Sequence, residues 1–157
     1  MPQLSPLRAQ YYFHAIGEGA LYTETLYPQL LPDSTHFDAL GQLSQNLLRA
    51  ARVVADTGIH AKHWSRQQAL DYLLSHTALT ETEASNEVDR YISLPAQAVS
   101  YKVGELFIQN MKRHAMARLG KQFDLRGFHQ VILENSSLPL TLIPQAVDIW
   151  INTTTAL

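Results

Sequence analysis

The sequence predicts an all-α protein, and three observations favour that fold class. Apolar residues recur at spacings of three and four along most of the chain, which is the period of a helix with one buried face. Residue pairs typical of helix starts, and glycines typical of helix ends, separate these runs. The only alternating run, "LPLTL" at 138–142, lies among prolines, which are unfavourable inside a sheet. We therefore expect six or seven helices in a single helical domain over 1–157.

The first half of the chain contains four expected helices. "LRAQYYFHAIGEGALYTETLYPQLL" predicts the first, and "THFDALGQLSQNLLRAARVVADTG" predicts the second, with Gly58 as its C-terminal stop. Ser65 with Gln68, and Thr80 with Glu83, form the capping-box pattern that satisfies free amides at a helix start. Two shorter helices are therefore expected over "SRQQALDYLLSHT" and "TETEASNEVDRYI".

The second half is expected to hold one long helix and two short ones. "LPAQAVSYKVGELFIQNMKRHAMARLG" begins at Pro95, a favourable first-turn residue, and runs to Gly120. Asp124 is typical of a helix cap before "LRGFHQVILENS". "IPQAVDIWI" predicts the last helix.

Composition excludes several classes of protein. A hydrophobic content of 46% with 17% charged residues excludes a disordered chain. The net charge is −2 and no long run of one sign occurs, so we expect no binding of nucleic acid or of an anionic membrane surface. No apolar run approaches the roughly 18 residues of a membrane span. Cysteine is absent, which excludes disulfides, thiolate catalysis and thiolate metal ligands.

The first of three polar clusters is "HAIGEGALYTE". His14 and Glu18 lie four residues apart, so they share a face of a helix, and both side-chain types are zinc donors. Gly17 and Gly19 flank the carboxylate, although each glycine costs a helix interior about 1 kcal/mol relative to alanine. A bend or a close backbone approach would explain them. The alternative is the polar edge of an amphipathic helix.

The second cluster is "RAARVVADTGIHAKHW". Arg52 and Asp56 have the spacing of an ion pair on a helix. His60 and His63 are expected in the turn that follows Gly58, and polar side chains that project from a helix end often form a functional surface. The alternative is a coincidence of spacing in a chain with seven histidines.

The third cluster is "YISLPAQAVSYKVGE". Gln97 and Tyr101 lie one turn apart near the start of the long helix, where a phenol could donate a hydrogen bond to a developing oxyanion. The alternative is an amphipathic tyrosine with its ring in the core and its hydroxyl in water. The sequence has no His-Glu-x-x-His, Gly-x-Ser-x-Gly, phosphate-binding glycine loop or calcium loop. The residues alone thus predict a helical domain with three polar clusters.

These clusters, in this order, resemble the C-terminal part of the bacterial proteins grouped as DUF885, a domain of unknown function. The shared blocks are "EGALYTE" at 18–24, "RVVADTGIHAKHWS" at 52–65 and "EVDRYISLPAQAVSYKVGE" at 87–105, continued by "LGKQFDLRGFHQVIL" and "LPLTLI". Members of that family look like gluzincin-type metallopeptidases. They carry an upstream His-Glu-x-x-Pro-Gly-His element that this sequence lacks, and they have Trp where this sequence has Ala20. We therefore expect a C-terminal fragment of a longer protein.

The resemblance implies a role for each cluster. Glu18 would be the third zinc ligand of the intact enzyme, whose other ligands lie in the upstream element. Tyr101 and His60 would be catalytic, since they would stabilise the oxyanion formed when a peptide carbonyl is attacked. The residues implied in substrate binding are Arg52, Asp56 and Gln97.

The resemblance also implies the partners. They are a peptide substrate, zinc in the intact protein but none in the isolated chain, and the missing N-terminal portion of the same protein. The isolated chain would be inactive and would self-associate as a homo-oligomer, and the full-length protein would be located in the cell envelope or periplasm. The alternative is a non-catalytic helical module that binds another protein.

Overall fold

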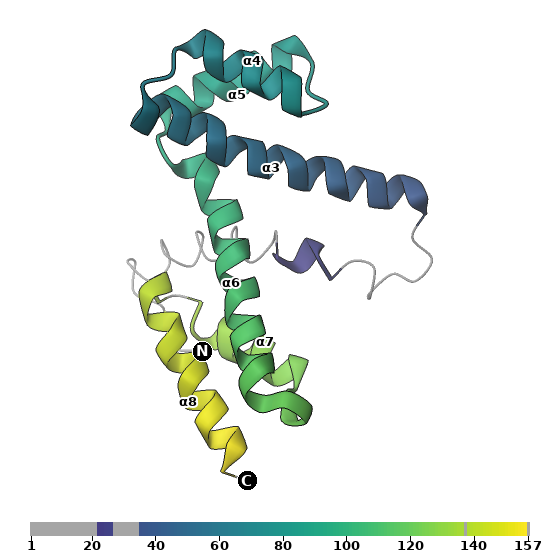
Figure 1. Ribbon diagram of the computed structural model, residues 1–157, viewed down its shortest axis with the longest axis vertical. Coiled ribbons are helices and arrows are strands. Elements are labelled where there is room, and N and C mark those ends of the chain that lie inside the picture. The colour runs from purple at the N-terminus through teal and green to yellow at the C-terminus, as the bar shows by residue number, and fades with distance from the viewer. Residues whose placement is uncertain (1–21, 27–34, 137, 157) are drawn as a thin grey trace, which may run out of the picture. The chain divides into compact units, whose positions relative to one another are not determined.

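The computed structural model describes residues 22–26, 35–136 and 138–156. Over these ranges the protein is all-helical and contains no strand, which confirms the predicted fold class (Figure 1). The run "LPLTL" forms a 3-10 turn, η2, at Leu140–Leu142 instead of a strand. The expected first helix lies almost wholly outside the described residues, as do His14 and Glu18. The α-helices are α3 (His36–Lys62), α4 (Arg66–His76), α5 (Glu81–Ser93), α6 (Gln97–Leu119), α7 (Leu125–Glu134) and α8 (Ile143–Thr155).

Helix starts follow the expected side-chain caps. The side chains of Ser65 and Thr80 accept hydrogen bonds from the amides of Gln68 and Glu83, whose own side chains accept from the capping amides in return. Both predicted capping boxes are therefore confirmed. Asp124 caps α7 as expected, because its carboxylate accepts from two amides of the first turn.

The end of α3 differs from the prediction. The helix continues through Gly58 to Lys62, and His63 ends it in the left-handed conformation, at φ 57°. The Trp64 ring packs directly against Gly58. A Cβ at this position would lie only 2.4 Å from Trp64 Cε3, so a larger residue would clash with the ring. The Trp64 amide donates to the Gly58 carbonyl over 2.9 Å, which satisfies one of the last free carbonyls of the helix. His60 thus lies in the last turn of α3, and the expectation of a turn there was wrong.

The long helix α6 begins at Gln97, two residues after the expected Pro95. Ala96 has a φ of 65°, which keeps it out of the helix. At the other end, Gly120 has a φ of 53° and opens the 3-10 turn η1 (Gly120–Gln122).

Contacts divide the chain into two compact units. We call Thr23–Lys102 the first unit; it contains α3, α4, α5 and the start of α6. We call the described part of the other, Tyr22 with the residues from Val103 onward, the second unit; it contains the rest of α6, α7 and α8.

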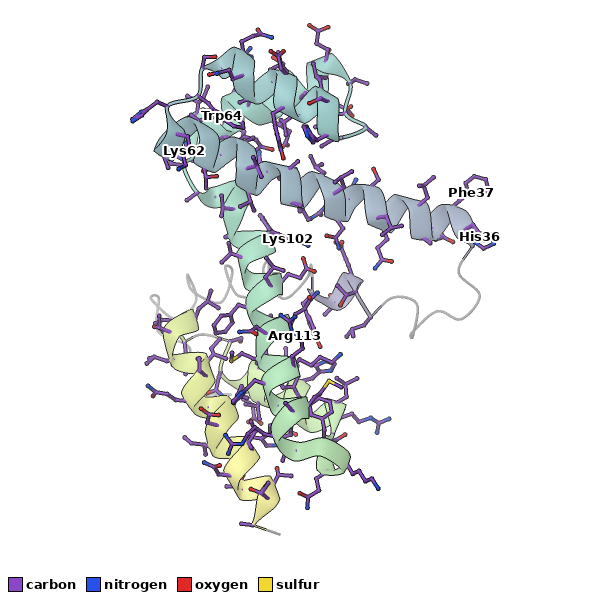
Figure 2. The ribbon with its side chains drawn as sticks, viewed as in Figure 1. His36, Phe37, Lys62, Trp64, Lys102 and Arg113 are labelled. Atoms are coloured by element: carbon purple, nitrogen blue, oxygen red, sulfur yellow. The ribbon has the colours of Figure 1, made fainter. Side chains whose placement is uncertain are left out.

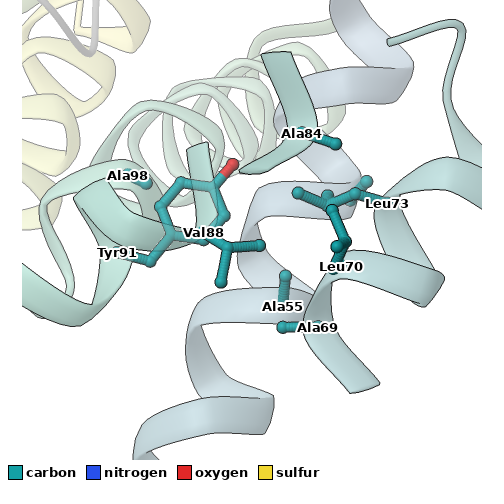
Figure 3. Packing of buried hydrophobic residues seen from close by; sticks show 9 residues of the cluster. Ala55, Ala69, Leu70, Leu73, Ala84, Val88, Tyr91 and Ala98 are labelled. Carbon is teal, nitrogen blue, oxygen red and sulfur yellow. The ribbon is translucent and has the colours of Figure 1, made fainter. Parts of the chain in front are cut away.

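In the first unit, α4 and α5 pack over one half of α3, the half that ends at Lys62 (Figure 1). Small alanine side chains let the helix backbones approach closely, and larger side chains, among them Leu73, Val88 and Tyr91, pack between them (Figure 3). The buried cluster consists of Ala51, Ala55, Ala69, Leu70, Leu73, Ala84, Val88, Tyr91 and Ala98. These side chains hold α3, α4, α5 and the start of α6 together, and the second and third polar clusters lie on or beside α3, α5 and α6.

The second unit has its own core. Phe128, Val147 and Ile151 are fully buried, and the rings of Phe123 and Phe128 pack against Trp150. In the ranges that the structure covers, no helix is both long enough and apolar enough to cross a bilayer.

Candidate functional site

The structure places five of the six predicted site residues in the first unit. Glu18 lies outside the described residues, so its surroundings stay a prediction. The five placed residues are Arg52, Asp56 and His60 on α3, and Gln97 and Tyr101 on α6.

Glu87 on α5 is the centre of the polar network at this site. Its Oε2 accepts hydrogen bonds from Arg52 Nε at 2.9 Å, Arg90 Nη2 at 2.8 Å and the Tyr91 hydroxyl at 2.7 Å. Burial alone would raise the pKa of Glu87, but the hydrogen bonds from Tyr91 and Arg90 and the charge of Arg52 outweigh it and hold the pKa below its ordinary value. Glu87 is therefore a carboxylate at neutral pH.

Arg90 extends the network from Glu87 to α6. Its Nη1 donates to Gln97 Oε1 at 2.5 Å, and Gln97 Nε2 donates to the Tyr101 hydroxyl oxygen at 3.4 Å. Three of the predicted residues, Arg52, Gln97 and Tyr101, thus belong to one continuous chain of hydrogen bonds that runs through Glu87 and Arg90.

Asp56 is buried and does not pair with Arg52, although the two have ion-pair spacing on α3. Its exposed fraction is 2%, and both carboxylate oxygens accept from the Ala96 amide, at 3.1 and 3.2 Å. Arg52 instead pairs with Glu87 on α5. The same Glu87 oxygen also accepts hydrogen bonds from Arg90 and Tyr91, which hold it in place. Asp56 therefore holds the left-handed residue that precedes α6.

His60 and Tyr101 have different partners. The exposed ring of His60 uses Nε2 to donate to the Tyr91 carbonyl oxygen at 3.0 Å, since a carbonyl can only accept. Tyr101 is bonded to Gln97. Among the described residues of the first unit, no hydrogen bond joins these two predicted catalytic residues directly. The network between them runs through Tyr91, Glu87, Arg90 and Gln97.

Sequence reasoning missed Glu87, Arg90 and Tyr91, although a signal for them was present. All three lie in the block "EVDRYISLPAQAVSYKVGE", and Arg90 and Tyr91 follow Glu87 by three and four residues. That spacing places the three side chains on one helix face.

The described residues do not by themselves form a metal centre. Within residues 22–26, 35–136 and 138–156, no three histidine, aspartate or glutamate side chains are grouped closely enough to hold a metal ion.

Comparisons with known proteins complete the description of the site. A family model described as "Bacterial protein of unknown function (DUF885)" matches residues 1–147. None of the curated proteins matches the chain. A solved structure, "The crystal structure of the putative lipoprotein from Colwellia psychrerythraea", has 39% sequence identity and a TM-score of 0.85. The match covers 89% of this chain and 24% of that chain, so this chain spans about a quarter of the length of the Colwellia protein.

Proposed function

Because this chain belongs to the DUF885 family, we propose that it is the C-terminal portion of a larger zinc-dependent peptidase and forms one wall of the active site. The larger size is supported by the Colwellia protein, of which this chain matches only 24%. Glu18 supplies one zinc ligand in this proposal, and the other ligands come from polypeptide beyond the described residues. A location in the cell envelope is part of the proposal, since the Colwellia protein is described as a lipoprotein in its title.

The observation that carries the proposal is the hydrogen-bond network that ends at Tyr101. Peptide hydrolysis places negative charge on the carbonyl oxygen, and a hydroxyl held in place beforehand stabilises that charge without reorganisation. Gln97 holds the Tyr101 hydroxyl, and Arg90 holds Gln97. Tyr101 is therefore the proposed donor to the oxyanion.

The other predicted residues support the same wall. Asp56 positions the start of α6 through the Ala96 amide, so we assign it a positioning role beside its predicted place in substrate binding. Arg52 stays a candidate for binding a substrate carboxylate, although it is shared with Glu87. His60 is exposed on the last turn of α3 and stays the second candidate for oxyanion stabilisation.

The test joins this chain to the preceding region of a DUF885 protein that carries His-Glu-x-x-Pro-Gly-His. Peptide hydrolysis and zinc content, by mass spectrometry, are measured on the joined protein and on its Glu18→Gln variant. We expect the variant to lose zinc and activity together, because two ligands hold the metal much more weakly than three.

Glu24→Gln is the matched control for that experiment. Glu24 belongs to the same sequence block, but its carboxylate lies 3.7 Å from Arg49, so its loss removes only a surface ion pair. We expect this variant to keep its zinc. A Glu18→Gln protein with full zinc content and full activity would contradict the proposal.

One observation favours a second candidate function, a non-catalytic module that pairs with a second copy of itself. On the half of α3 that begins at His36, large apolar side chains are exposed. Phe37 is exposed by 84% (Figure 2), Leu40 by 63% and Leu47 by 53%. They are spaced by three and seven residues, and the same face continues into buried Ala51. This is the spacing of a coiled-coil seam, and the same half of a second α3 would offer matching apolar residues.

Sedimentation of the chain, with a Leu40→Lys and Leu47→Lys double variant, tests this second function. A dimer that the double variant converts to a monomer would support self-pairing through α3. A chain that sediments as a monomer at all concentrations would exclude it.

A further inference from the structure

A chain of hydrogen bonds runs from Glu87 through Arg90 and Gln97 to Tyr101. The direction of each bond is fixed by which groups can donate and which can only accept. A guanidinium group has donors and no acceptor. The atom of Gln97 that faces Arg90 is therefore the amide oxygen, as the 2.5 Å contact to Oε1 shows. The amide nitrogen must then face Tyr101, and it lies 3.4 Å from the hydroxyl oxygen.

This direction decides what the Tyr101 hydroxyl can do. An amide nitrogen can only donate, so the Tyr101 oxygen accepts and its own hydrogen points to another partner. If the amide of Gln97 were turned over, Tyr101 would donate to Gln97 and its hydrogen would be consumed. The orientation of one amide thus separates a tyrosine that can donate outward from one that cannot.

Glu87 keeps Arg90 in the position on which that orientation depends. Its carboxylate holds one arm of the guanidinium at 2.8 Å, which leaves the other arm directed at Gln97. Arg52 and Tyr91 donate to the same oxygen, so Glu87 is fixed from α3 as well as from its own helix. A charged hydrogen bond of this kind is roughly twice as strong as a neutral one.

We propose that Glu87 and Arg90 are positioning residues that orient the Gln97 amide and thereby direct the Tyr101 hydroxyl hydrogen toward the substrate. The identity of its acceptor, a peptide oxyanion, rests on the proposed function. The direction of the bonds does not, because it follows from the donors and acceptors of this chain alone.

The first experiment reads the direction in the isolated chain, without any activity. The side-chain amide signals of Gln97 are assigned by nuclear magnetic resonance through Gln97→Glu, which removes them. We expect Tyr101→Phe to shift the Gln97 amide hydrogen signal, because that hydrogen loses its acceptor. We also expect Glu87→Gln to shift it, because Arg90 is released.

Glu81→Gln is the matched control, because it makes the same chemical change on the exposed first turn of α5. It is expected to leave the Gln97 signals in place. Where Glu87→Gln proves unfolded by circular dichroism, Arg90→Lys gives the second measurement, since lysine keeps the charge but cannot hold two acceptors with a planar fork. Gln97 signals that stay unmoved in Tyr101→Phe, or in every folded variant at Glu87 and Arg90, would overturn the proposal.

The second experiment uses the joined protein described above. Glu87→Gln is expected to lower kcat by roughly tenfold to a hundredfold with little change in KM. The reason is that the Tyr101 hydroxyl stabilises charge that forms only in the transition state, so its misdirection leaves substrate binding unchanged. Gln97→Glu is expected to do the same, because a carboxylate there would accept the Tyr101 hydrogen. Unchanged kcat in both variants, with the magnetic resonance shifts present, would overturn the role of the network in turnover.

The two experiments separate this inference from the proposed function. A joined protein with no peptidase activity in any form would contradict the proposed function alone. The magnetic resonance shifts would still decide whether Glu87 and Arg90 direct Tyr101.

Discussion

Three donors converge on one oxygen of Glu87, and two of them are guanidinium groups. The exposed fractions of the side chains are only 20% for Glu87 and 16% for Arg52, so water cannot easily replace either partner. Removal of the charge would leave two half-buried cations facing a neutral group. At the scale of single residues, Glu87 is therefore a position where the first unit is sensitive to a change of charge.

The substitution Glu87→Gln is expected to destabilise the first unit by about 2 kcal/mol, the size of a lost hydrogen bond to a charged group with its partners left behind. Urea denaturation followed by circular dichroism measures the loss. Glu81→Gln, on the exposed first turn of the same helix, should stay within about 0.5 kcal/mol of the parent. A Glu87→Gln protein as stable as the Glu81→Gln protein would show that the network contributes nothing to folding.

His129 gives the second unit a dependence on pH. Its Nε2 lies 2.8 Å from the Tyr22 hydroxyl. Burial, followed by the charge of Lys112, lowers the pKa of His129 below its ordinary value of 6.5. The unfolded chain therefore takes up a proton more readily than the folded one, so the contribution of neutral His129 to stability is complete above about pH 6.5 and is lost as the pH falls below it.

Urea denaturation of the parent and of His129→Gln at about pH 7.5 and about pH 5.5 tests this dependence. The parent should lose more stability between the two values than the variant, because a glutamine at position 129 does not titrate. Equal losses would contradict the assigned role of His129.

At the scale of helices, Gly58 shows that a residue type can indicate the wrong feature. Glycine after a run of apolar residues is a common helix stop. Here α3 continues through Gly58. The residue is glycine because the Trp64 ring packs on the helix backbone at the place that a side chain would occupy. The element ends one turn later at His63.

Gly58→Ala and Gly41→Ala form a matched pair within α3. Alanine at Gly41 meets nothing within 4 Å and is expected to stabilise the helix by about 0.5–1 kcal/mol. Alanine at Gly58 would have to displace the Trp64 ring, and we expect a net loss of about 1–2 kcal/mol despite the same gain in propensity. Thermal unfolding of both variants measures the difference. Equal stabilisation by both would show that the Trp64 ring moves aside at little cost.

The features that could be predicted from the sequence are those set by residues close together along the chain. The capping boxes at Ser65 and Thr80 and the cap at Asp124 satisfy amides within three residues, so the sequence pattern was sufficient. The partner of Arg52 was not predictable in this way. Two carboxylates compete for it, Asp56 on the same helix and Glu87 on another, and the packing of α5 on α3 decides between them.

The same limit applied to the candidate site. Gln97 and Tyr101 were identified from their position in the sequence blocks, and the structure joins them. Glu87 and Arg90 were overlooked, because a charge pair on a helix usually lies on a solvated surface. Only the tertiary contacts with Arg52 and Gln97 distinguish this pair from such a surface.

At the scale of the whole molecule, the chain consists of two units, each with a buried core of its own. The alanine-rich cluster of the first unit comes from α3, α4, α5 and the start of α6, whereas the aromatic cluster of the second joins Phe123 to α7 and α8. We therefore expect substitutions in one core to affect that unit first.

The chain has two tryptophans, and each unit contains one of them: Trp64 stands in the first and Trp150 in the second. Each unit thus carries its own intrinsic fluorophore, and replacing one indole by phenylalanine leaves an optical reporter for the other half of the protein. In a Trp150→Phe background, Glu87→Gln should move the emission midpoint of Trp64 to lower urea. In a Trp64→Phe background, the midpoint of Trp150 should move less. Identical displacements of both midpoints would mean that the two halves melt as a single cooperative body.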